Sequence, residues 1–303
     1  MGDIWSRIYG TIFLEGIPVQ RNEPMKYHTT IRIGGPVQLL VKPFDVDSLR
    51  KILEILKVYG VTYRILGQGS NLLVADEKLD TVVISTEYLD EVEFKGTRLI
   101  VGAGLTLART IHIAMKQELS GLEFAAGIPG SVGGAVVMNA GAFEGCMADV
   151  VEKVEAIDEN GRMVTLLNSE MNFGYRTSLF RTERMIITSI EMRLSRDDIS
   201  SIRERIEKHL EHRLKTQPLE YPSAGSVFKR PMKDFYVGKA IESLGLKGLK
   251  IGGAMVSPKH AGFIINADNA SFRDVVELME LIQRRIEERF HVKLEKEVEI
   301  WNV

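Results

Sequence analysis

The sequence predicts an α+β protein on the strength of three features. Short apolar or alternating runs indicate strands through most of residues 20–195, without the regular strand–helix alternation of a doubly wound sheet. Two stripes of apolar residues at helical spacing follow, over 199–214 and 272–290. The composition changes at Arg196-Asp197-Asp198, between the strand-rich residues 20–195 and the two helical stripes, and we place a domain boundary there. With 303 residues, the chain is long enough for two or three domains.

The first half is expected to begin with a short amphipathic helix over residues 1–16, with Ile4, Trp5, Ile8 and Ile12 on one side. A turn at Gly34-Gly35 leads into a strand, and Asp45 or Asp47 can cap a helix over 48–59. The next expected element is a strand from 62 that is interrupted at 67–71 and resumes at 72–74. Short strands are expected over 82–85, 92–94 and 99–102, followed by a helix over 105–119.

The second half continues the strand pattern before the two helices. Residues 150–167 form a predicted hairpin turned at Asn160-Gly161, a pair that favours a type I′ turn. A polar and aromatic loop over 173–178 and a strand over 185–194 come next. At the C-terminus we expect a strand over 292–301, whose alternation places Glu295, Glu297 and Glu299 on one face.

Residues 121–145 contain seven glycines among small and apolar residues. Glycine lets backbone N–H groups approach a ligand, and a helix beginning near Ser131 would add its positive end. The segment therefore predicts a phosphate or diphosphate site, and with it a nucleotide or dinucleotide cofactor. The alternative is that the glycines only allow tight packing of a buried helix. Neither GxxxxGK[ST] nor G-x-G-x-x-G in a βαβ unit occurs, which excludes a P-loop and argues against a Rossmann fold.

A second tight loop, Gly67-Gln68-Gly69-Ser70-Asn71, joins two apolar segments. Its exposed amides and short polar side chains suit the same kind of ligand. A plain hairpin turn is the alternative interpretation of this loop.

Composition limits the class of partner and the compartment. The chain is 45% hydrophobic and 26% charged with a net charge of −2, so it lacks the basic balance of a nucleic-acid-binding protein. The lone Cys146 excludes an internal disulfide and fits a reducing cytosol. No apolar run reaches the roughly 18 residues that span a bilayer, and the N-terminus lacks a signal-peptide pattern. We therefore expect a cytoplasmic protein without nucleic-acid or membrane partners.

Three loop elements carry reactive groups among small residues: Arg176 in YRTS, Ser226 with Lys229 in AGSVFKRP, and Glu297 in LEKEVEI. Taken singly, each has a plainer interpretation. Arg176 could form a surface ion pair, Ser226 could serve in a turn, and Glu297 could be one of three solvated glutamates.

Two other kinds of site are disfavoured. His209 and His212 lie three apart on a helix, but no carboxylate is placed to complete a metal site, and we expect no metal. No G-x-S-x-G surrounds Ser226, which argues against a hydrolase triad.

Six elements between His28 and Ile300 together resemble the UDP-N-acetylenolpyruvoylglucosamine reductase family: HTTIRIGG, LGQGSNLLV, AAGIPGSVGGAVVMNAGA, GYRTSLF, AGSVFKRP and LEKEVEI. The resemblance implies an FAD-binding domain of the vanillyl-alcohol-oxidase or p-cresol-methylhydroxylase type and a C-terminal α+β substrate domain. It also implies FAD and NADPH as cofactors. The implied reaction reduces UDP-N-acetylglucosamine enolpyruvate to UDP-N-acetylmuramate in peptidoglycan precursor synthesis. The alternatives are another FAD-dependent oxidoreductase of this fold and a non-catalytic sugar-nucleotide sensor.

The resemblance also implies roles for individual residues. Arg176 matches the arginine that stabilises the developing negative charge, Ser226 the proton donor, and Glu297 the glutamate that assists that stabilisation. Substrate contacts are expected from Tyr175, Gln217, Lys229 and Arg230. The expected cofactor-binding residues are Leu66, Gly67, Gln68, Gly69, Ser70, Asn71, Leu72, Gly127, Ile128, Pro129, Gly130, Ser131, Gly133, Gly134, Asn139 and Gly141.

The expected domains are an N-terminal helix at 1–19, two FAD-binding subdomains at 20–80 and 81–196, and a substrate-binding domain at 197–303. Little sequence separates YRTS from AGSVFKRP, which matches the shorter form of the family without its inserted substrate-capping segment. Glu299 stands where many relatives carry arginine, and Trp301-Asn302 replaces a common Ile-Gly ending, so contacts beyond Glu297 stay open. We expect a monomer whose partners are the small-molecule substrate and NADPH.

Overall fold

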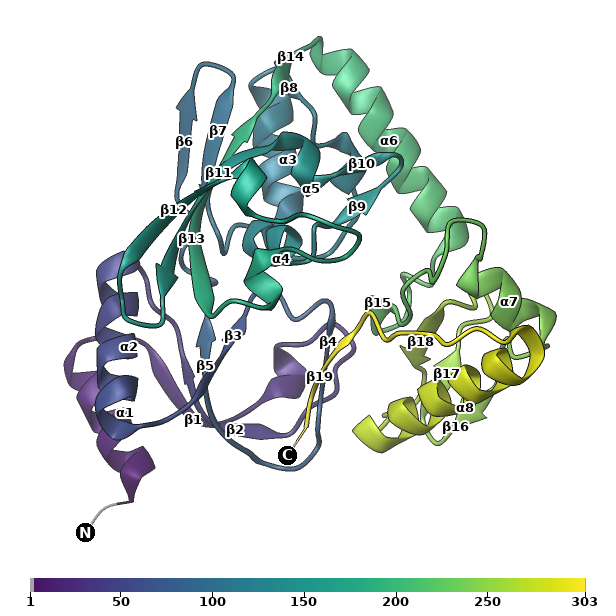
Figure 1. Cartoon of the computed structure of the whole chain (residues 1–303), viewed down its shortest axis with the longest axis horizontal. Helices are drawn as coiled ribbons and strands as arrows, with labels where there is room; N and C mark the ends of the chain where they lie inside the picture. Colours follow the sequence, from purple (N-terminus) through teal and green to yellow (C-terminus); the bar gives the residue numbers. More distant parts are fainter. Residues whose placement is uncertain (1–2, 303) are drawn as a thin grey trace. The chain divides into compact units, whose positions relative to one another are not determined.

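The computed structural model describes residues 3–302, and the chain divides into two compact units. Unit 1 comprises Met1–Arg21, Gln38–Gln68 and Thr81–His212, and unit 2 comprises Asn22–Val37, Gly69–Asp80 and Arg213–Val303. Each unit thus draws on three separate stretches, whose elements are labelled in Figure 1. The four domain bounds expected from the sequence describe a different division and stay a prediction.

Unit 1 contains a five-stranded antiparallel sheet of order β12-β11-β13-β7-β6. Its strands are β6 Val92–Lys95, β7 Arg98–Gly102, β11 Val151–Asp158, β12 Met163–Leu167 and β13 Met185–Arg193. The helices α3 Leu107–Lys116, α4 Val132–Val137 and α5 Met147–Val150 lie together beside this sheet (Figure 1). Val136 of α4 and Ile190 of β13 are fully buried in the core that the sheet and helices share.

The N-terminal part of unit 1 carries two helices, α1 Ile4–Leu14 and α2 Val46–Tyr59. Asp45 caps α2 by accepting a hydrogen bond from the Ser48 N–H, as predicted. Ile8 and Ile12 of α1 are buried as expected, whereas residues 1 and 2 of the predicted helix lie outside the described residues. The adjoining sheet has the order β1-β2-β5-β3, with strands β1 Val19–Pro24, β2 Pro36–Val41, β3 Tyr63–Leu66 and β5 Leu79–Ser85.

Unit 2 packs α8 Phe272–Phe290 and α7 Val237–Ser243 with a four-stranded sheet of order β15-β18-β17-β16. The strands are β15 Ser223–Ser226, β16 Lys250–Ile251, β17 Ala254–Val256 and β18 Phe263–Asn266. Val275, Met279 and Ile282 of the predicted apolar stripe are buried in this core. The last strand, β19 Glu299–Trp301, pairs in parallel with β4 Leu72–Val74.

The predicted C-terminal strand over 292–301 is wrong in extent. Only β19 forms, because its partner β4 offers three residues, and the chain bends at Val298 just before it. Glu295 and Glu297 therefore lie outside the strand, and the expectation that they share a strand face with Glu299 is also wrong.

The predicted hairpin of β11 and β12 is present, but its turn is not type I′. A type I′ turn needs a positive φ at both central residues, and only Gly161 has one, at 79°. Asp158 Oδ1 accepts hydrogen bonds from the N–H groups of Asn160 and Arg162, both at 2.8 Å. These local bonds stabilise a different turn.

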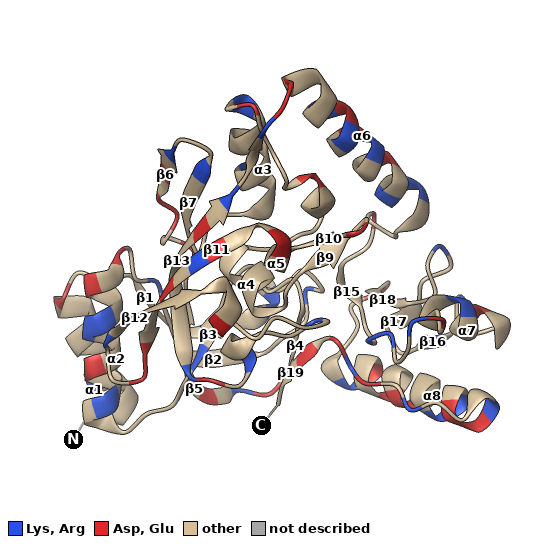
Figure 2. Ribbon diagram, turned by 45° about the horizontal axis from the view of Figure 1, so that its top comes forward, with Lys and Arg blue, Asp and Glu red and all other residues tan. Residues whose placement is uncertain are grey.

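The long helix α6 Ile199–Thr216 begins at the predicted boundary, and its first fourteen residues belong to unit 1. Ile202 of its apolar stripe is buried, whereas Leu210 is 39% exposed. Figure 2 shows that α6 and α8 each carry both signs of charge. Among residues 3–302, no helix combines the length and apolar character needed to cross a membrane. The remaining short strands are β8 Leu119–Ser120, β9 Gly141–Ala142, β10 Gly145–Cys146 and β14 Ser195–Arg196.

Candidate active site

The glycine-rich segment of unit 1 begins with a short 3-10 turn, Glu123–Ala125, and leads into α4. The predicted helix start near Ser131 is confirmed, because Ser131 caps α4 and its Oγ accepts a hydrogen bond from the Gly134 N–H at 3.2 Å. Gly127 and Gly130 before it have φ values of 75° and 148°, which residues with a Cβ rarely adopt. The segment thus combines a left-handed loop with the N-terminus of α4, a helix of only six residues.

Several N–H groups of this segment already have partners in the protein. The Val132 N–H donates to the Leu105 carbonyl at 2.8 Å, and the Gly133 N–H donates to the Ala103 carbonyl at 2.9 Å. A Cβ on Gly133 would lie 2.8 Å from the Cβ of Ala103. Tight packing, the alternative interpretation, therefore accounts for Gly133.

The loop at 67–71 is different, because its N–H groups are available. Among the described residues, the N–H groups of residues 67–70 have no hydrogen-bond acceptor. The loop is not a hairpin turn either, since β3 before it pairs in parallel with β5 and β4 after it pairs in parallel with β19. Successive unpaired N–H groups make a concave site for an anion.

Within unit 1, Gly67 of the first predicted cofactor segment lies beside Ser131 of the second. A Cβ on Gly67 would lie 2.5 Å from the Oγ of Ser131, the residue that caps α4. Only a residue without a side chain fits there, so Gly67 allows the close approach of the first loop to the start of α4.

Arg176 lies in a tight turn of unit 1 formed by residues 174–177. The N–H of Gly174 donates to the carbonyl of Thr177 at 3.0 Å, and Arg176 has a φ of 55°. Its guanidinium Nη2 donates to the Gly141 carbonyl at 3.0 Å and lies over the ring of Tyr175. These two contacts hold the Arg176 side chain against the Gly141 carbonyl and the Tyr175 ring.

Ser226 and Glu297 lie on adjacent backbone segments of unit 2. The Glu297 N–H donates to the carbonyl of Val227, the residue after Ser226, at 2.8 Å. Asn71 joins this pair, because its Nδ2 donates to the Glu297 carbonyl at 3.0 Å. Three predicted site residues from distant parts of the chain thus meet within one unit, whereas Arg176 belongs to unit 1.

The Ser226 hydroxyl is available for chemistry. Ser226 ends β15 beside a bulge at Gly225, which has a φ of 77°, and it is partly exposed. Among the described residues its hydroxyl makes no hydrogen bond, so it is free to donate to a ligand.

The predicted substrate residues already have neighbours in the protein. Lys229 Nζ lies 3.1 Å from Glu295 Oε2, and Gln217 Oε1 accepts a hydrogen bond from Arg213 at 3.3 Å. The Arg230 guanidinium lies 4.7 Å from the ring centre of Tyr236. Tyr175 is 55% exposed. The expected substrate contacts stay predictions.

The two histidines of α6 pack against an aromatic ring. Phe143, at the tip of the hairpin formed by β9 and β10, stacks on His209 at 3.9 Å and meets His212 edge-on at 5.4 Å between ring centres. Within residues 3–302, no three His, Cys, Asp or Glu side chains gather as metal ligands would.

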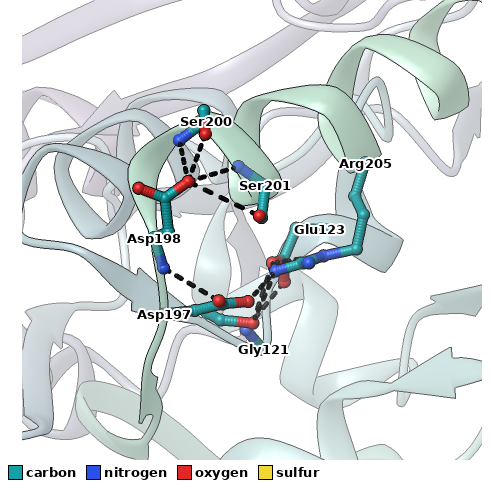
Figure 3. A network of polar contacts seen from close by, with 8 residues as sticks. Gly121, Glu123, Asp197, Asp198, Ser200, Ser201 and Arg205 are labelled. Carbon is teal, nitrogen blue, oxygen red and sulfur yellow. Dashed lines mark hydrogen bonds and ion pairs between the residues drawn. The ribbon is translucent and has the colours of Figure 1, made fainter.

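A polar network fixes the start of the glycine-rich segment to α6 (Figure 3). Glu123 is 7% exposed, and its Oε1 accepts a hydrogen bond from Arg205 Nη2 at 2.8 Å. Its Oε2 accepts another from the Gly121 N–H at 2.7 Å. Burial raises the pKa of the Glu123 carboxyl, but the hydrogen bonds from Arg205 and the backbone outweigh burial and hold this pKa below its ordinary value.

We predict that Glu123→Gln lowers the free energy of unfolding by about 2 kcal/mol at neutral pH. This loss is smaller than that expected for a fully buried ion pair, because the Arg205 side chain is 41% exposed. A depressed pKa in the folded state stabilises the protein above the unfolded-state pKa, and this stabilisation is lost as the pH falls through the folded-state value. The difference in unfolding free energy between the wild-type protein and Glu123→Gln should therefore shrink below the ordinary carboxyl pKa of 4.5. Denaturant unfolding at several pH values measures it.

The control is Glu93→Gln, which removes an exposed ion pair with Lys95 and should change the unfolding free energy by less than about 0.5 kcal/mol. A Glu123→Gln protein as stable as Glu93→Gln at pH 7 would contradict a stabilising function for the network.

Two contacts in this site could not be found by sequence reasoning. The bond from Asn71 to the Glu297 carbonyl joins residues 226 positions apart. Asn139 is expected at the cofactor, but its side-chain amide bonds to backbone groups: it donates to the Gly174 carbonyl and accepts from the Ala148 N–H. Its cofactor contact stays a prediction.

Two protein-family models match the chain. A model described as an FAD binding domain matches residues 37–167, and one described as the C-terminal domain of UDP-N-acetylenolpyruvoylglucosamine reductase matches residues 217–301. Together the two models cover the loop at 67–71, the glycine-rich segment at 121–145, Ser226 and Glu297, but not Arg176.

Curated relatives are similar over almost their whole length. UDP-N-acetylenolpyruvoylglucosamine reductase of Thermotoga sp. strain RQ2 is 48% identical over 295 residues, covering 97% of each chain. The enzyme of the same name from Caldanaerobacter subterraneus is 46% identical over 279 residues, covering 92% of each chain.

Solved structures agree with the predicted fold class. The crystal structure of UDP-N-acetylenolpyruvylglucosamine reductase (MurB) from Thermus caldophilus matches with a TM-score of 0.80 and 36% identity, over 94% of this chain and all of that one. A solvent-stable cholesterol oxidase matches at a TM-score of 0.50 and 17% identity, over 60% of this chain and 38% of its own, which is a likeness of fold alone. The expected α+β architecture, with a flavin-binding domain and a C-terminal substrate domain, is confirmed.

Proposed function

The chain belongs to the UDP-N-acetylenolpyruvoylglucosamine reductase family, and we infer from this membership that it is an FAD-dependent oxidoreductase that reduces UDP-N-acetylglucosamine enolpyruvate to UDP-N-acetylmuramate. NADPH is the proposed reductant. The observation that carries this proposal is the 48% identity to a reductase of this name over 97% of the chain. The activity belongs to peptidoglycan precursor synthesis.

The residues present fit an FAD diphosphate. The N–H groups of residues 67–70 have no acceptor among the described residues, and Gly67 allows the loop to lie against the start of α4. We assign the diphosphate to this loop, where backbone donors can neutralise it without lysine or arginine. The left-handed turn at 127–130 is the second proposed cofactor segment. When bound, FAD accepts a hydride from NADPH and passes it to the substrate. The cofactor-binding residues predicted from the sequence, apart from Asn139, stay part of this proposal.

Reduction of the enolpyruvyl double bond adds a hydride to its terminal methylene carbon and a proton to the neighbouring carbon that bears the carboxylate. Negative charge develops on that carbon and its carboxylate after the hydride arrives. In the proposed mechanism the Arg176 guanidinium stabilises this charge, because a planar fork of N–H donors matches a carboxylate. Glu297 assists this stabilisation.

Ser226 is the proposed proton donor to the carbon that bears the carboxylate. Its hydroxyl is free to donate, but a serine is a weak acid in water, so its neighbours must support the transfer. Lys229 follows three residues later and is the proposed contact for the substrate diphosphate. Tyr175, Gln217 and Arg230 complete the proposed set of substrate contacts.

The remaining expectations from the sequence are proposals as well. NADPH would bind and leave before the sugar nucleotide takes its place. The protein acts as a monomer in the cytoplasm, with only small-molecule partners. Its functional domains have the bounds 1–19, 20–80, 81–196 and 197–303.

The test is an anaerobic titration of the purified, FAD-loaded protein. NADPH should bleach the flavin absorbance near about 450 nm, and the enolpyruvyl UDP-sugar should restore it quickly. Bleaching without recovery would instead favour the alternative that the protein is another FAD-dependent oxidoreductase of this fold with a different substrate. A protein that binds the sugar nucleotide but is not reduced by NADPH would be a sensor, and one that takes up no FAD would refute the whole assignment.

A further inference from the structure

Arg176 occupies a backbone conformation that its own side chain disfavours. Its φ of 55° is left-handed, which costs a residue with a Cβ roughly 1 kcal/mol relative to the ordinary regions. Gly174 and Thr177 close the turn around it through mutual N–H to carbonyl bonds of 3.0 and 3.4 Å. Such a conformation persists only where the surrounding structure imposes it.

Asn139, just after α4, holds the start of this turn. It is 8% exposed, and its Nδ2 donates to the Gly174 carbonyl at 3.0 Å. Its Oδ1 accepts from the Ala148 N–H at 2.9 Å, so one amide links the end of α4, the turn and the start of α5. A second brace follows the turn, where Ser178 Oγ donates to the Val137 carbonyl at 2.8 Å.

The same segment also directs the guanidinium of Arg176. The acceptor of its Nη2 is the carbonyl of Gly141, two residues after Asn139 in the chain. A Cβ on Gly141 would lie 2.7 Å from the Gly145 carbonyl oxygen, so this residue keeps the β9–β10 hairpin narrow. Residues 139–141 therefore fix both the backbone of the turn and the direction of the side chain.

We propose that Asn139 is a positioning residue for Arg176, acting through its bond to the backbone of the turn and not by contacting substrate or cofactor. The proposal rests on the proposed function, because it concerns the reaction assigned to Arg176. It gives Asn139 a different role from the cofactor contact expected from the sequence. Both ends of its amide are already engaged with the backbone, which favours this role.

Asn139→Asp tests the proposal with little change of shape. The Asp side chain can still accept from the Ala148 N–H, but it has no N–H for the Gly174 carbonyl and sets a negative oxygen against it. We expect reoxidation of the reduced flavin by the enolpyruvyl UDP-sugar to slow by roughly 10–100-fold, as a misplaced catalytic group does. Reduction by NADPH should stay within about twofold of the wild-type rate, because Arg176 has no role in it. Stopped-flow absorbance measures both rates.

Asn168→Asp is the matched control. Asn168 also bridges backbone carbonyls in unit 1, donating to Ala148 at 2.9 Å and to Val151 at 2.7 Å, but it makes no contact with the turn of Arg176. A merely structural effect would appear in both variants and lower their thermal stability alike. We expect the selective loss of reoxidation only in Asn139→Asp. Selective loss in both variants, or in neither, would overturn the proposal.

A double variant separates this inference from the proposed function. If Asn139 acts through Arg176, then Asn139→Asp should slow reoxidation little further once Arg176→Lys is present. Independent, multiplying effects would overturn the positioning role, as would loss of FAD binding in Asn139→Asp. A wild-type reoxidation rate in Arg176→Lys alone would instead refute the role proposed for Arg176.

Ser178→Ala provides a second route if Asn139→Asp does not fold. It removes the bond to the Val137 carbonyl at the other end of the turn. We expect a smaller slowing of reoxidation with unchanged reduction by NADPH. A slowing of both half-reactions by the same factor would count against positioning of Arg176 by these braces.

Discussion

Ser226→Ala should leave reduction of the bound flavin by NADPH nearly intact and slow its reoxidation by the enolpyruvyl UDP-sugar by roughly 10²–10⁴-fold. The hydroxyl is the proposed source of the proton that completes reduction of the double bond, and the first half-reaction needs no such proton. Removing a partly exposed hydroxyl that has no hydrogen bond among the described residues should barely affect folding. Anaerobic stopped-flow measurement of each half-reaction gives the two rates separately.

Ser223→Ala is the matched control for this variant. Ser223 lies on the same strand, and the bond that it receives from Thr30 Oγ1, at 2.7 Å, ends on its backbone carbonyl. The substitution therefore keeps that bond, and both half-reactions should proceed at the wild-type rate. Equal slowing of the two half-reactions in Ser226→Ala would show that Ser226 serves the structure of the site and not proton transfer.

The helices could be predicted from the sequence because their signals are local. Asp45 precedes an apolar stripe and caps α2, and Ser131 precedes a short run of small residues and caps α4. The stripe over 272–290 coincides with α8 at both ends. In each case the residues that form the element also determine where it begins.

The strands were harder to predict, because a strand extends only as far as its partner. Residues 292–301 alternate as a strand should, but β4 supplies only three residues for pairing. At Asn160-Gly161 the composition favours a type I′ turn, whereas Asp158 captures two nearby N–H groups and stabilises another turn. A competing side chain thus determined the local geometry.

The sequence allowed individual residues of the candidate site to be proposed one at a time, but it did not predict how the fold arranges them in space. Glycine content alone cannot separate Gly133, which allows contact with Ala103, from Gly69, whose N–H is available to a ligand. That difference depends on which carbonyls the fold brings near each N–H. The bond between Asn71 and Glu297 likewise depends on the pairing of β4 with β19, which no local pattern reveals.

Gly69→Ala should be the most damaging substitution in the predicted cofactor loop. Gly69 has a φ of 60°, and an added Cβ would lie 2.0 Å from the carbonyl oxygen of His28 and 3.0 Å from the Cα of Thr29. These neighbours are backbone atoms and cannot rotate away. The strained φ and the forced separation together should lower the free energy of unfolding by about 2–5 kcal/mol.

The same clash should weaken cofactor binding, because relief requires loop 67–71 to move away from residues 28–30. The Gly69 carbonyl also accepts a hydrogen bond from the Thr30 N–H at 3.2 Å, which that movement would break. The available N–H groups at 67–70 would then no longer converge on one anion. FAD titration of the apoprotein should show an affinity lower by roughly 100-fold or more, equivalent to about 3 kcal/mol of binding free energy.

Gly10→Ala separates the effect of position from the effect of losing a glycine. Gly10 lies inside α1 with no atom within 4 Å of an added Cβ and an ordinary φ, so alanine there should stabilise the protein by about 0.5–1 kcal/mol. Thermal unfolding of both apoproteins, followed by FAD titration, distinguishes the two cases. The contrary outcome is that Gly69→Ala unfolds at the same temperature as Gly10→Ala and binds FAD as tightly as that variant does. That result would show that the contact with His28 does not constrain the loop, and the assignment of the diphosphate to residues 67–70 would lose its structural basis.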